Sequence, residues 1–187
     1  MEDSIMLHHR KEIFNSAVKE TSDSLIRDFF IEKNYWITLV LKRLFESEYA
    51  DSVVFKGGTS LSKAFGLINR FSEDIDLAIV SNLMTLGNQI KNLIRDVEKE
   101  IAIDLKEIET SGVTRKGSKF RKSVFSYPTI FENRAATAIS DKLIIEINSF
   151  ANPYPYQKVQ IMSFIGKFFQ LNNAIELIKK YNLEPSN

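Results

Sequence analysis

A glycine pair between a short apolar run and a helix-like segment constrains this chain more than any other feature. Residues 53–55 are wholly apolar, which is typical of a buried strand, and Gly57 and Gly58 follow one residue later. The spacing from residue 59 to residue 65 predicts a helix. Glycine allows close backbone approach, and a helix N-terminus offers free N–H groups to an anion. This strand–turn–helix unit therefore predicts a phosphate-binding site.

Two aspartates stand at the start of the next apolar run. Residues 75–80 predict a second buried strand, and Asp74 and Asp76 are two positions apart at its beginning. The strand period of two places both carboxylates on one face of the sheet. Two like charges so close are costly unless a cation lies between them. Carboxylate ligands without histidine predict a hard cation, Mg²⁺ or Mn²⁺.

A third carboxylate lies far along the chain. Glu146 interrupts the apolar strand predicted at residues 143–150. If that strand neighbours the strand of Asp74 and Asp76, the three carboxylates form the kind of cluster that a two-metal phosphoryl-transfer site needs. On the other side of such a site, Thr59 and Ser60 would add hydroxyl donors to the phosphate-binding turn.

Each of these features has an ordinary structural explanation when taken alone. A glycine pair is usually a simple turn, a D-x-D is often the exposed end of a strand, and Glu146 can face outward. A dense basic run after residue 114 is either a set of phosphate contacts for RNA or the solvated tip of a hairpin. Its members are Arg115, Lys116, Lys119, Arg121 and Lys122. The glycine pair, the D-x-D and Glu146 occur in this order along the chain. Their order favours a site that binds a metal and a phosphate group.

Composition narrows the function classes further. The 187 residues include no cysteine, and the two histidines are adjacent, which argues against thiolate chemistry and a histidine-based metal site. A net charge of +1 provides no global field for a polyanion. The N-terminus lacks the features of a signal peptide, and every apolar run is too short to cross a bilayer. We therefore expect a cytoplasmic protein without membrane partners.

The hydrophobic pattern divides the chain into three segments. Helical spacing runs through residues 1–50, strands and helices mix in residues 51–158, and helical spacing returns in residues 159–187. This order predicts an α/β or α+β fold around one central sheet. We expect the first segment to pack on the core and the second to contain the catalytic residues.

The sequence between the first strand and the second resembles a known family. The string FKGGTSLSKAFGLINRFSEDIDLAI is similar to the AbiEii/AbiGii toxin family of nucleotidyltransferases, within the wider DNA polymerase β-like superfamily. The superfamily pattern is a glycine pair at a helix start, then D-h-[DE]-h, then a separate h-[DE]-h, where h is hydrophobic. Here these are Gly57-Gly58, residues 74–77 and residues 145–147, and the resemblance extends over about residues 20–185.

The resemblance implies a nucleotidyltransferase fold, with a central mixed β-sheet flanked by helices. It also implies metal-dependent transfer of a nucleoside monophosphate from an NTP to RNA or tRNA, in a type IV toxin–antitoxin system that aborts phage infection, with a winged-helix antitoxin. Asp74, Asp76 and Glu146 match the metal-binding carboxylates, and Glu146 is alternatively the base for the acceptor hydroxyl. The positions matching the phosphate-binding or supporting residues are Gly57, Gly58, Thr59, Ser60, Lys56, Arg70 and Ser72.

Two departures from the family keep alternatives open. Asn34 stands where many relatives have Asp, and relatives continue well past residues 183–185, so we expect the C-terminal helical segment to be truncated. One alternative is a catalytically incomplete module that binds nucleotide, RNA or an antitoxin. Another is a phosphotransferase that passes on the γ-phosphate of the NTP.

Overall fold

The computed structural model describes residues 5–23, 26–65, 74–80, 87–131, 142–151 and 153–186. Arg70 and Ser72, two of the predicted supporting residues, lie outside these ranges. The chain forms two compact units. The helical unit comprises Met1–Leu39, Thr129–Thr137 and Gln160–Asn187, and the sheet unit comprises Val40–Pro128 and Ala138–Val159.

The helical unit is held together by an aromatic core. Its helices are α1 (Lys11–Thr21), the first part of α2 (Asp28–Glu46), α5 (Phe164–Leu171) and α6 (Ile175–Lys180). Phe14, Tyr35 and Trp36 are almost fully buried, and the rings of Phe14 and Tyr35 lie 4.7 Å apart. His8 Nδ1 is 2.8 Å from the Tyr35 hydroxyl, so this histidine helps to organise the core.

Polar side chains of α2 accept hydrogen bonds from other segments of the same unit. The buried Glu32 carboxylate accepts hydrogen bonds from the N–H of Ile130 at 2.7 Å and the hydroxyl of Thr129 at 2.9 Å. Asn34 Oδ1 accepts from the N–H of Phe164 at 2.9 Å, at the first residue of α5. An amide oxygen therefore satisfies one of the free N–H groups at that helix end.

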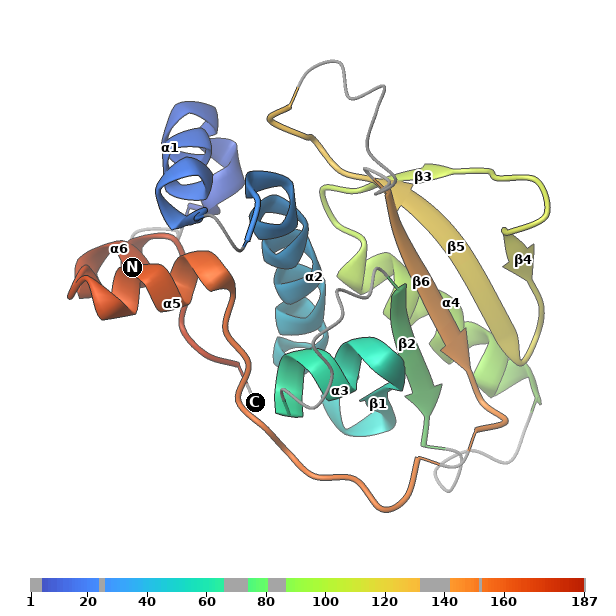
Figure 1. Ribbon diagram of the computed structural model, residues 1–187. Coiled ribbons are helices and arrows are strands. Elements are labelled where there is room, and N and C mark those ends of the chain that lie inside the picture. Colours follow the sequence, from blue (N-terminus) through green and yellow to red (C-terminus); the bar gives the residue numbers. More distant parts are fainter. Residues whose placement is uncertain are drawn as a thin grey trace. The chain divides into compact units, whose positions relative to one another are not determined.

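The sheet unit contains one mixed sheet (Figure 1). Its strands are β1 (Val53–Lys56), β2 (Asp74–Ile79), β3 (Lys106–Ile108), β4 (Arg115–Lys116), β5 (Phe120–Ser126) and β6 (Lys142–Asn148). The order is β1-β2-β6-β5-β3, with β4 paired to β5. The β2–β6 pair is parallel and the others are antiparallel, which confirms the predicted fold class with a central mixed sheet.

Side-chain alternation gives the two faces of this sheet different neighbours. On β2 and β6 the residues Ile75, Leu77, Ile145 and Ile147 are fully buried. They lie on the face covered by α4 (Gly87–Ile101), which Figure 1 shows behind the sheet. The residues between them lie on the opposite face, where α3 (Gly57–Phe65) follows directly from β1.

The β-type composition of residues 101–108 predicts a strand, but Ile101 ends α4 and only Lys106–Ile108 is extended. Arg43 Nη2 binds Asp104 Oδ2 at 2.5 Å, and Asp104 has a φ of 64°, so the chain turns there before the strand.

The C-terminal segment of helical spacing contains two helices, α5 and α6. Asn173 adopts a φ of 57°, a left-handed conformation that asparagine tolerates and that ends a helix. Among the described residues, the helices include none that is both long and apolar enough to cross a membrane.

Candidate active site

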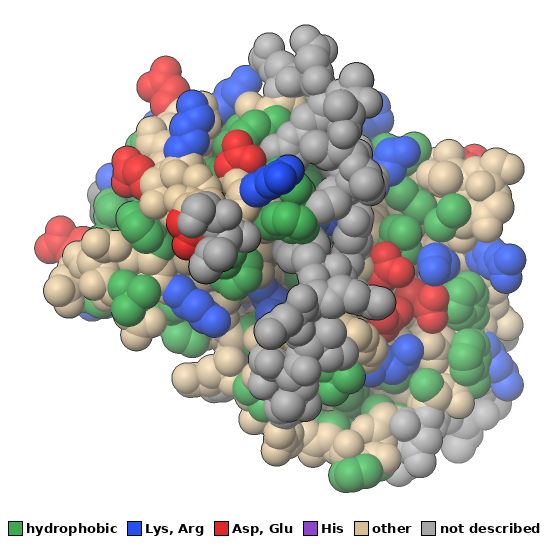
Figure 2. All heavy atoms as spheres, viewed as in Figure 1, with side chains coloured by type: hydrophobic (Ala, Val, Ile, Leu, Met, Phe, Trp, Pro, Cys, Tyr) green, Lys and Arg blue, Asp and Glu red, His purple; other side chains and the backbone are tan. Residues whose placement is uncertain are grey.

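The parallel pairing of β2 with β6 brings the predicted carboxylates together. Asp76 lies directly opposite Glu146, and Asp74 lies two residues earlier on the same face of β2. Neighbouring strands are about 4.8 Å apart, so side chains in register are close neighbours. Figure 2 shows acidic side chains gathered over β2 and β6, with basic side chains on both sides.

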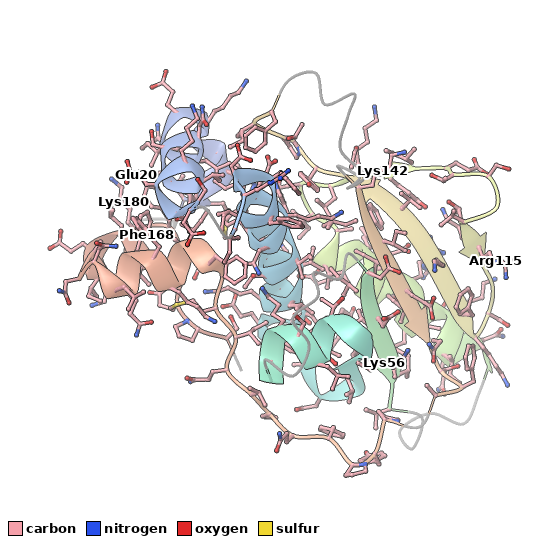
Figure 3. All side chains as sticks on the ribbon, in the orientation of Figure 1. Glu20, Lys56, Arg115, Lys142, Phe168 and Lys180 are labelled. Carbon is pink, nitrogen blue, oxygen red and sulfur yellow. The ribbon has the colours of Figure 1, made fainter. Side chains whose placement is uncertain are left out.

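Basic residues occupy the positions in register with Asp76 and Glu146 on the neighbouring strands. Lys56 lies opposite Asp76, Lys122 opposite Glu146, and Arg115 opposite Lys122. We call these five residues the charged row. Lys122 Nζ is 3.5 Å from Glu146 Oε2. Figure 3 shows Lys56 beside β2 and Arg115 at the outer edge of the sheet, so the two acids lie between flanking cations.

The surroundings of Asp76 raise the pKa of its carboxyl group. Burial is the largest cause, and the charges of Glu146 and Asp74 raise the pKa further, while Lys56 and Lys122 lower it. The carboxylates therefore repel one another at a partly buried position. A divalent cation bound among them would offset this repulsion, and oxygen ligands suit Mg²⁺ or Mn²⁺, so the residues fit the metal that the sequence predicted.

Gly57 brings the main chain against the carboxylate of Asp76. Its φ is 79°, and a Cβ atom added there would lie 2.2 Å from Asp76 Oδ2. Both the conformation and the contact therefore require glycine at this position. The beginning of α3, with Gly57 and Gly58 as its first residues, is thus adjacent to the carboxylates.

Thr59 and Ser60 are buried, and their hydroxyl groups donate to backbone oxygens. The Thr59 hydroxyl donates to the carbonyl of Asp74 at 2.5 Å, and the Ser60 hydroxyl donates to the carbonyl of Gly57 at 2.8 Å. The Thr59 bond connects α3 to β2, and the Ser60 bond holds the glycine turn in place. The first N–H groups of α3 remain the natural donors for an anion at this turn.

The basic run predicted on the hairpin is divided between the two faces. Lys122 and Arg115 belong to the charged row, but Arg121 points to the α4 face and forms an ion pair with the buried Glu98. Ser123 donates to the same carboxylate at 2.5 Å. The pairing of Lys122 with Glu146 was not foreseen, although the alternation along β5 could have indicated that Arg121 and Lys122 face opposite ways.

Residues 39–177 match the family model described as "Nucleotidyl transferase AbiEii toxin, Type IV TA system". This chain belongs to the AbiEii family. The matched range contains the glycine turn, all three carboxylates and Lys122, and the resemblance inferred from the sequence is confirmed.

The AbiEii chain also matches a solved structure, MenT4, the nucleotidyltransferase toxin Rv2826c from Mycobacterium tuberculosis H37Rv. The identity is 15% and the TM-score is 0.35. The match covers 74% of this chain but 43% of MenT4, so the chain spans less than half the length of that toxin. No curated protein matches the chain in sequence.

Proposed function

We propose that this AbiEii chain is a metal-dependent nucleotidyltransferase that transfers a nucleoside monophosphate from an NTP to a hydroxyl group of RNA, with tRNA as the expected acceptor. The observation that carries the proposal is the register of Asp76 with Glu146, next to a glycine turn in which any other residue would be strained. This arrangement places candidate metal ligands and a candidate phosphate site side by side.

Asp74, Asp76 and Glu146 would hold the metal, Mg²⁺ or Mn²⁺. When bound, the metal would neutralise the triphosphate and lower the pKa of the attacking hydroxyl group. The acceptor oxygen forms a bond to the α-phosphorus as the bond to pyrophosphate breaks. Glu146 is either a third metal ligand or the group that receives the proton of the acceptor hydroxyl.

The beginning of α3 would bind the triphosphate. Its first N–H groups and the positive end of its dipole favour an anion, and Gly57 and Gly58 leave room for phosphate oxygens near the backbone. Thr59 connects this helix to β2 and Ser60 holds the turn, each by a bond to a backbone oxygen. Lys56 lowers the pKa of Asp76 and so helps to keep this ligand ionised.

The family also supports a biological role. We propose that the activity is toxic, serves abortive infection in the cytoplasm, and is countered by a winged-helix antitoxin encoded beside it. Expression of the chain should arrest bacterial growth, and co-expression of the neighbouring gene should restore it. Growth arrest that persists in an Asp76→Asn variant of normal abundance would contradict this role for the transferase activity.

Incubation of the chain with total tRNA and each NTP, labelled at either the α- or the γ-phosphate, tests the reaction. We expect metal-dependent transfer of the α-label alone and release of labelled pyrophosphate from the γ-labelled NTP. Transfer of the γ-label would instead show a phosphotransferase. The absence of any transfer, together with retained NTP binding, would show a binding module.

Matched variants show whether transfer depends on the site carboxylates in particular or on the net charge of the chain. Asp76→Asn and Glu146→Gln each remove one negative charge from the site and should reduce transfer by about 10³-fold or more, equivalent to about 4 kcal/mol. Glu100→Gln removes one charge from the exposed side of α4 and should leave transfer unchanged. Equal losses in all three variants would refute the assignment of the site.

A further inference from the structure

The two ends of the charged row differ in what surrounds them. At the Asp76 end, Gly57 and the beginning of α3 adjoin the carboxylate, and this is the side proposed for the triphosphate. Beyond Glu146 the row continues to Lys122 and Arg115, at the edge formed by β4 and β5. A transferase needs a place for its second substrate, and this flank is available for it.

An aromatic pair lies on the same flank. Phe120 is two residues before Lys122 on β5, so both side chains lie on the face of the charged row. The ring of Phe150 stacks on Phe120, with centroids 6.0 Å apart and planes at 20°. Phe150 is 68% exposed, so most of its ring is accessible to a ligand.

The position of Phe150 is supported by the backbone. The N–H of Ser149 donates to the carbonyl of Lys119 at 3.0 Å, and the Ser149 hydroxyl donates to the same oxygen at 3.3 Å. These bonds attach the segment after β6 to the start of β5. The exposed ring is therefore on a supported segment whose backbone partner, Lys119, has an exposed side chain, as does Arg115 on the neighbouring strand β4.

A stacked aromatic ring beside exposed cations is the chemistry that binds single-stranded nucleic acid. Bases stack on aromatic side chains regardless of their sequence, and Lys and Arg contact the phosphates between them. A protein partner would favour a broader apolar patch with few charges at its centre. Arg115 and Lys122 lie on the same face of the sheet as Phe120, and the exposed Lys119 directly precedes Phe120 in the chain, which favours a polyanion.

We propose that Phe150, Phe120, Arg115 and Lys119 bind a single-stranded segment of the RNA acceptor. A base of this segment stacks on Phe150, and its phosphates contact Arg115 and Lys119. Lys122 then lies between the bound segment and the proposed metal-binding carboxylates of Glu146 and Asp76. The inference rests on the proposed function, because it assigns the site of the second substrate in that reaction.

Fluorescence anisotropy tests the aromatic part, using the full chain and a 5′-labelled single-stranded RNA oligonucleotide without NTP or divalent metal. Phe150→Ala should weaken binding by about 5- to 100-fold, the range expected for the loss of one base-stacking contact. Phe150→Trp should retain binding. Ile103→Ala removes another apolar side chain that is half exposed in the same unit, and it should have no effect.

The salt dependence of the same binding tests the basic part. Arg115→Ala and Lys119→Ala should each reduce the slope of log K against log salt by about 0.7, the value for one phosphate contact on a single strand. Lys91 and Lys99 are exposed on α4, on the other side of the sheet. Lys91→Ala and Lys99→Ala remove the same charge and should leave the slope unchanged.

The outcomes separate this inference from the proposed function. Wild-type affinity in Phe150→Ala, or equal effects of Arg115→Ala and Lys99→Ala, would overturn the RNA-binding surface even if transfer to some acceptor is found. Transfer of the α-label to a polypeptide instead of RNA would also overturn it. Binding that depends on Phe150 and Arg115, without any transfer, would support the surface while refuting the nucleotidyltransferase activity.

Discussion

The two faces of the sheet are built from the same strands, but their acidic side chains have different neighbours. On the α4 face, Glu98 is almost fully buried and is bound by Arg121 and Ser123. On the other face, Asp76 and Glu146 lie side by side in register, with Asp74 close by. The first face pairs its buried acid with a base, whereas the second concentrates acids.

This difference indicates which charges serve stability and which serve chemistry. A buried acid with its hydrogen bonds satisfied is stable as it stands, and removal of one partner leaves the other without compensation. The raised pKa of Asp76 beside two other carboxylates is a cost to the fold, and such costs are typical of functional sites. Variants on the two faces should therefore change the free energy of unfolding in opposite directions.

The largest change in the free energy of unfolding is expected for a variant on the α4 face. Glu98→Ala leaves the mostly buried Arg121 without its partner and should lower the free energy of unfolding by about 3–5 kcal/mol, as measured by urea denaturation. The double variant Glu98→Leu with Arg121→Met removes both charges and should recover most of this loss. If the double variant is as unstable as the single one, the ion pair is not the reason for the loss.

Gly57 and Gly112 can be compared directly. They have nearly the same backbone conformation, but only Gly57 is crowded by a neighbouring side chain. Their φ values are 79° and 77°, but a Cβ atom at Gly112 would meet nothing within 4 Å. Gly112→Ala should cost about 1 kcal/mol from the left-handed conformation alone. Gly57→Ala should cost about 2–4 kcal/mol, since overpacking against Asp76 is added.

A double-mutant cycle with Asp76→Ala checks the cause. Removal of the carboxylate oxygen should relieve part of the cost of Gly57→Ala, which gives a coupling energy above about 0.5 kcal/mol. Gly112→Ala should show no coupling to Asp76→Ala. Additive effects at Gly57 would mean that its contact with the carboxylate is not what requires glycine there.

The local parts of this arrangement could be predicted from the sequence, and the long-range parts could not. The glycine turn and the shared face of Asp74 and Asp76 follow from strand and helix periodicity within a few residues. The register of Asp76 with Glu146 depends on pairing between strands far apart in the chain, which periodicity does not determine. The bond from the Thr59 hydroxyl to the carbonyl of Asp74 and the pairing of Lys122 with Glu146 depend on the same tertiary arrangement.

On the charged row, loss of an acid should stabilise the fold. Burial first, and then Glu146 and Asp74, raise the pKa of Asp76, so its ionisation opposes folding. This cost is present above the raised pKa and disappears as the pH falls below the value in the unfolded chain. Asp76→Asn should therefore raise the free energy of unfolding by about 0.2–1 kcal/mol at neutral pH without metal, and less in acid.

Denaturation of wild type and Asp76→Asn at pH 7 and pH 4 measures this difference. Added Mg²⁺ should stabilise the wild type but not the variant, because the variant lacks one of the proposed ligands. A variant that is less stable than the wild type at pH 7 would show that Asp76 contributes to the fold as Glu98 does. The contrast between the two faces would then be wrong.

The smallest effect is expected for an ion pair that resembles Glu98–Arg121 in chemistry but not in burial. Lys116 Nζ lies 2.6 Å from Glu107 Oε1, and the side chains are 43% and 37% exposed. Water solvates either partner when the other is removed, so Lys116→Ala should cost no more than about 0.5 kcal/mol, and less at high salt. A loss near that of Glu98→Ala would mean that burial is not what separates structural charges from the others in this sheet.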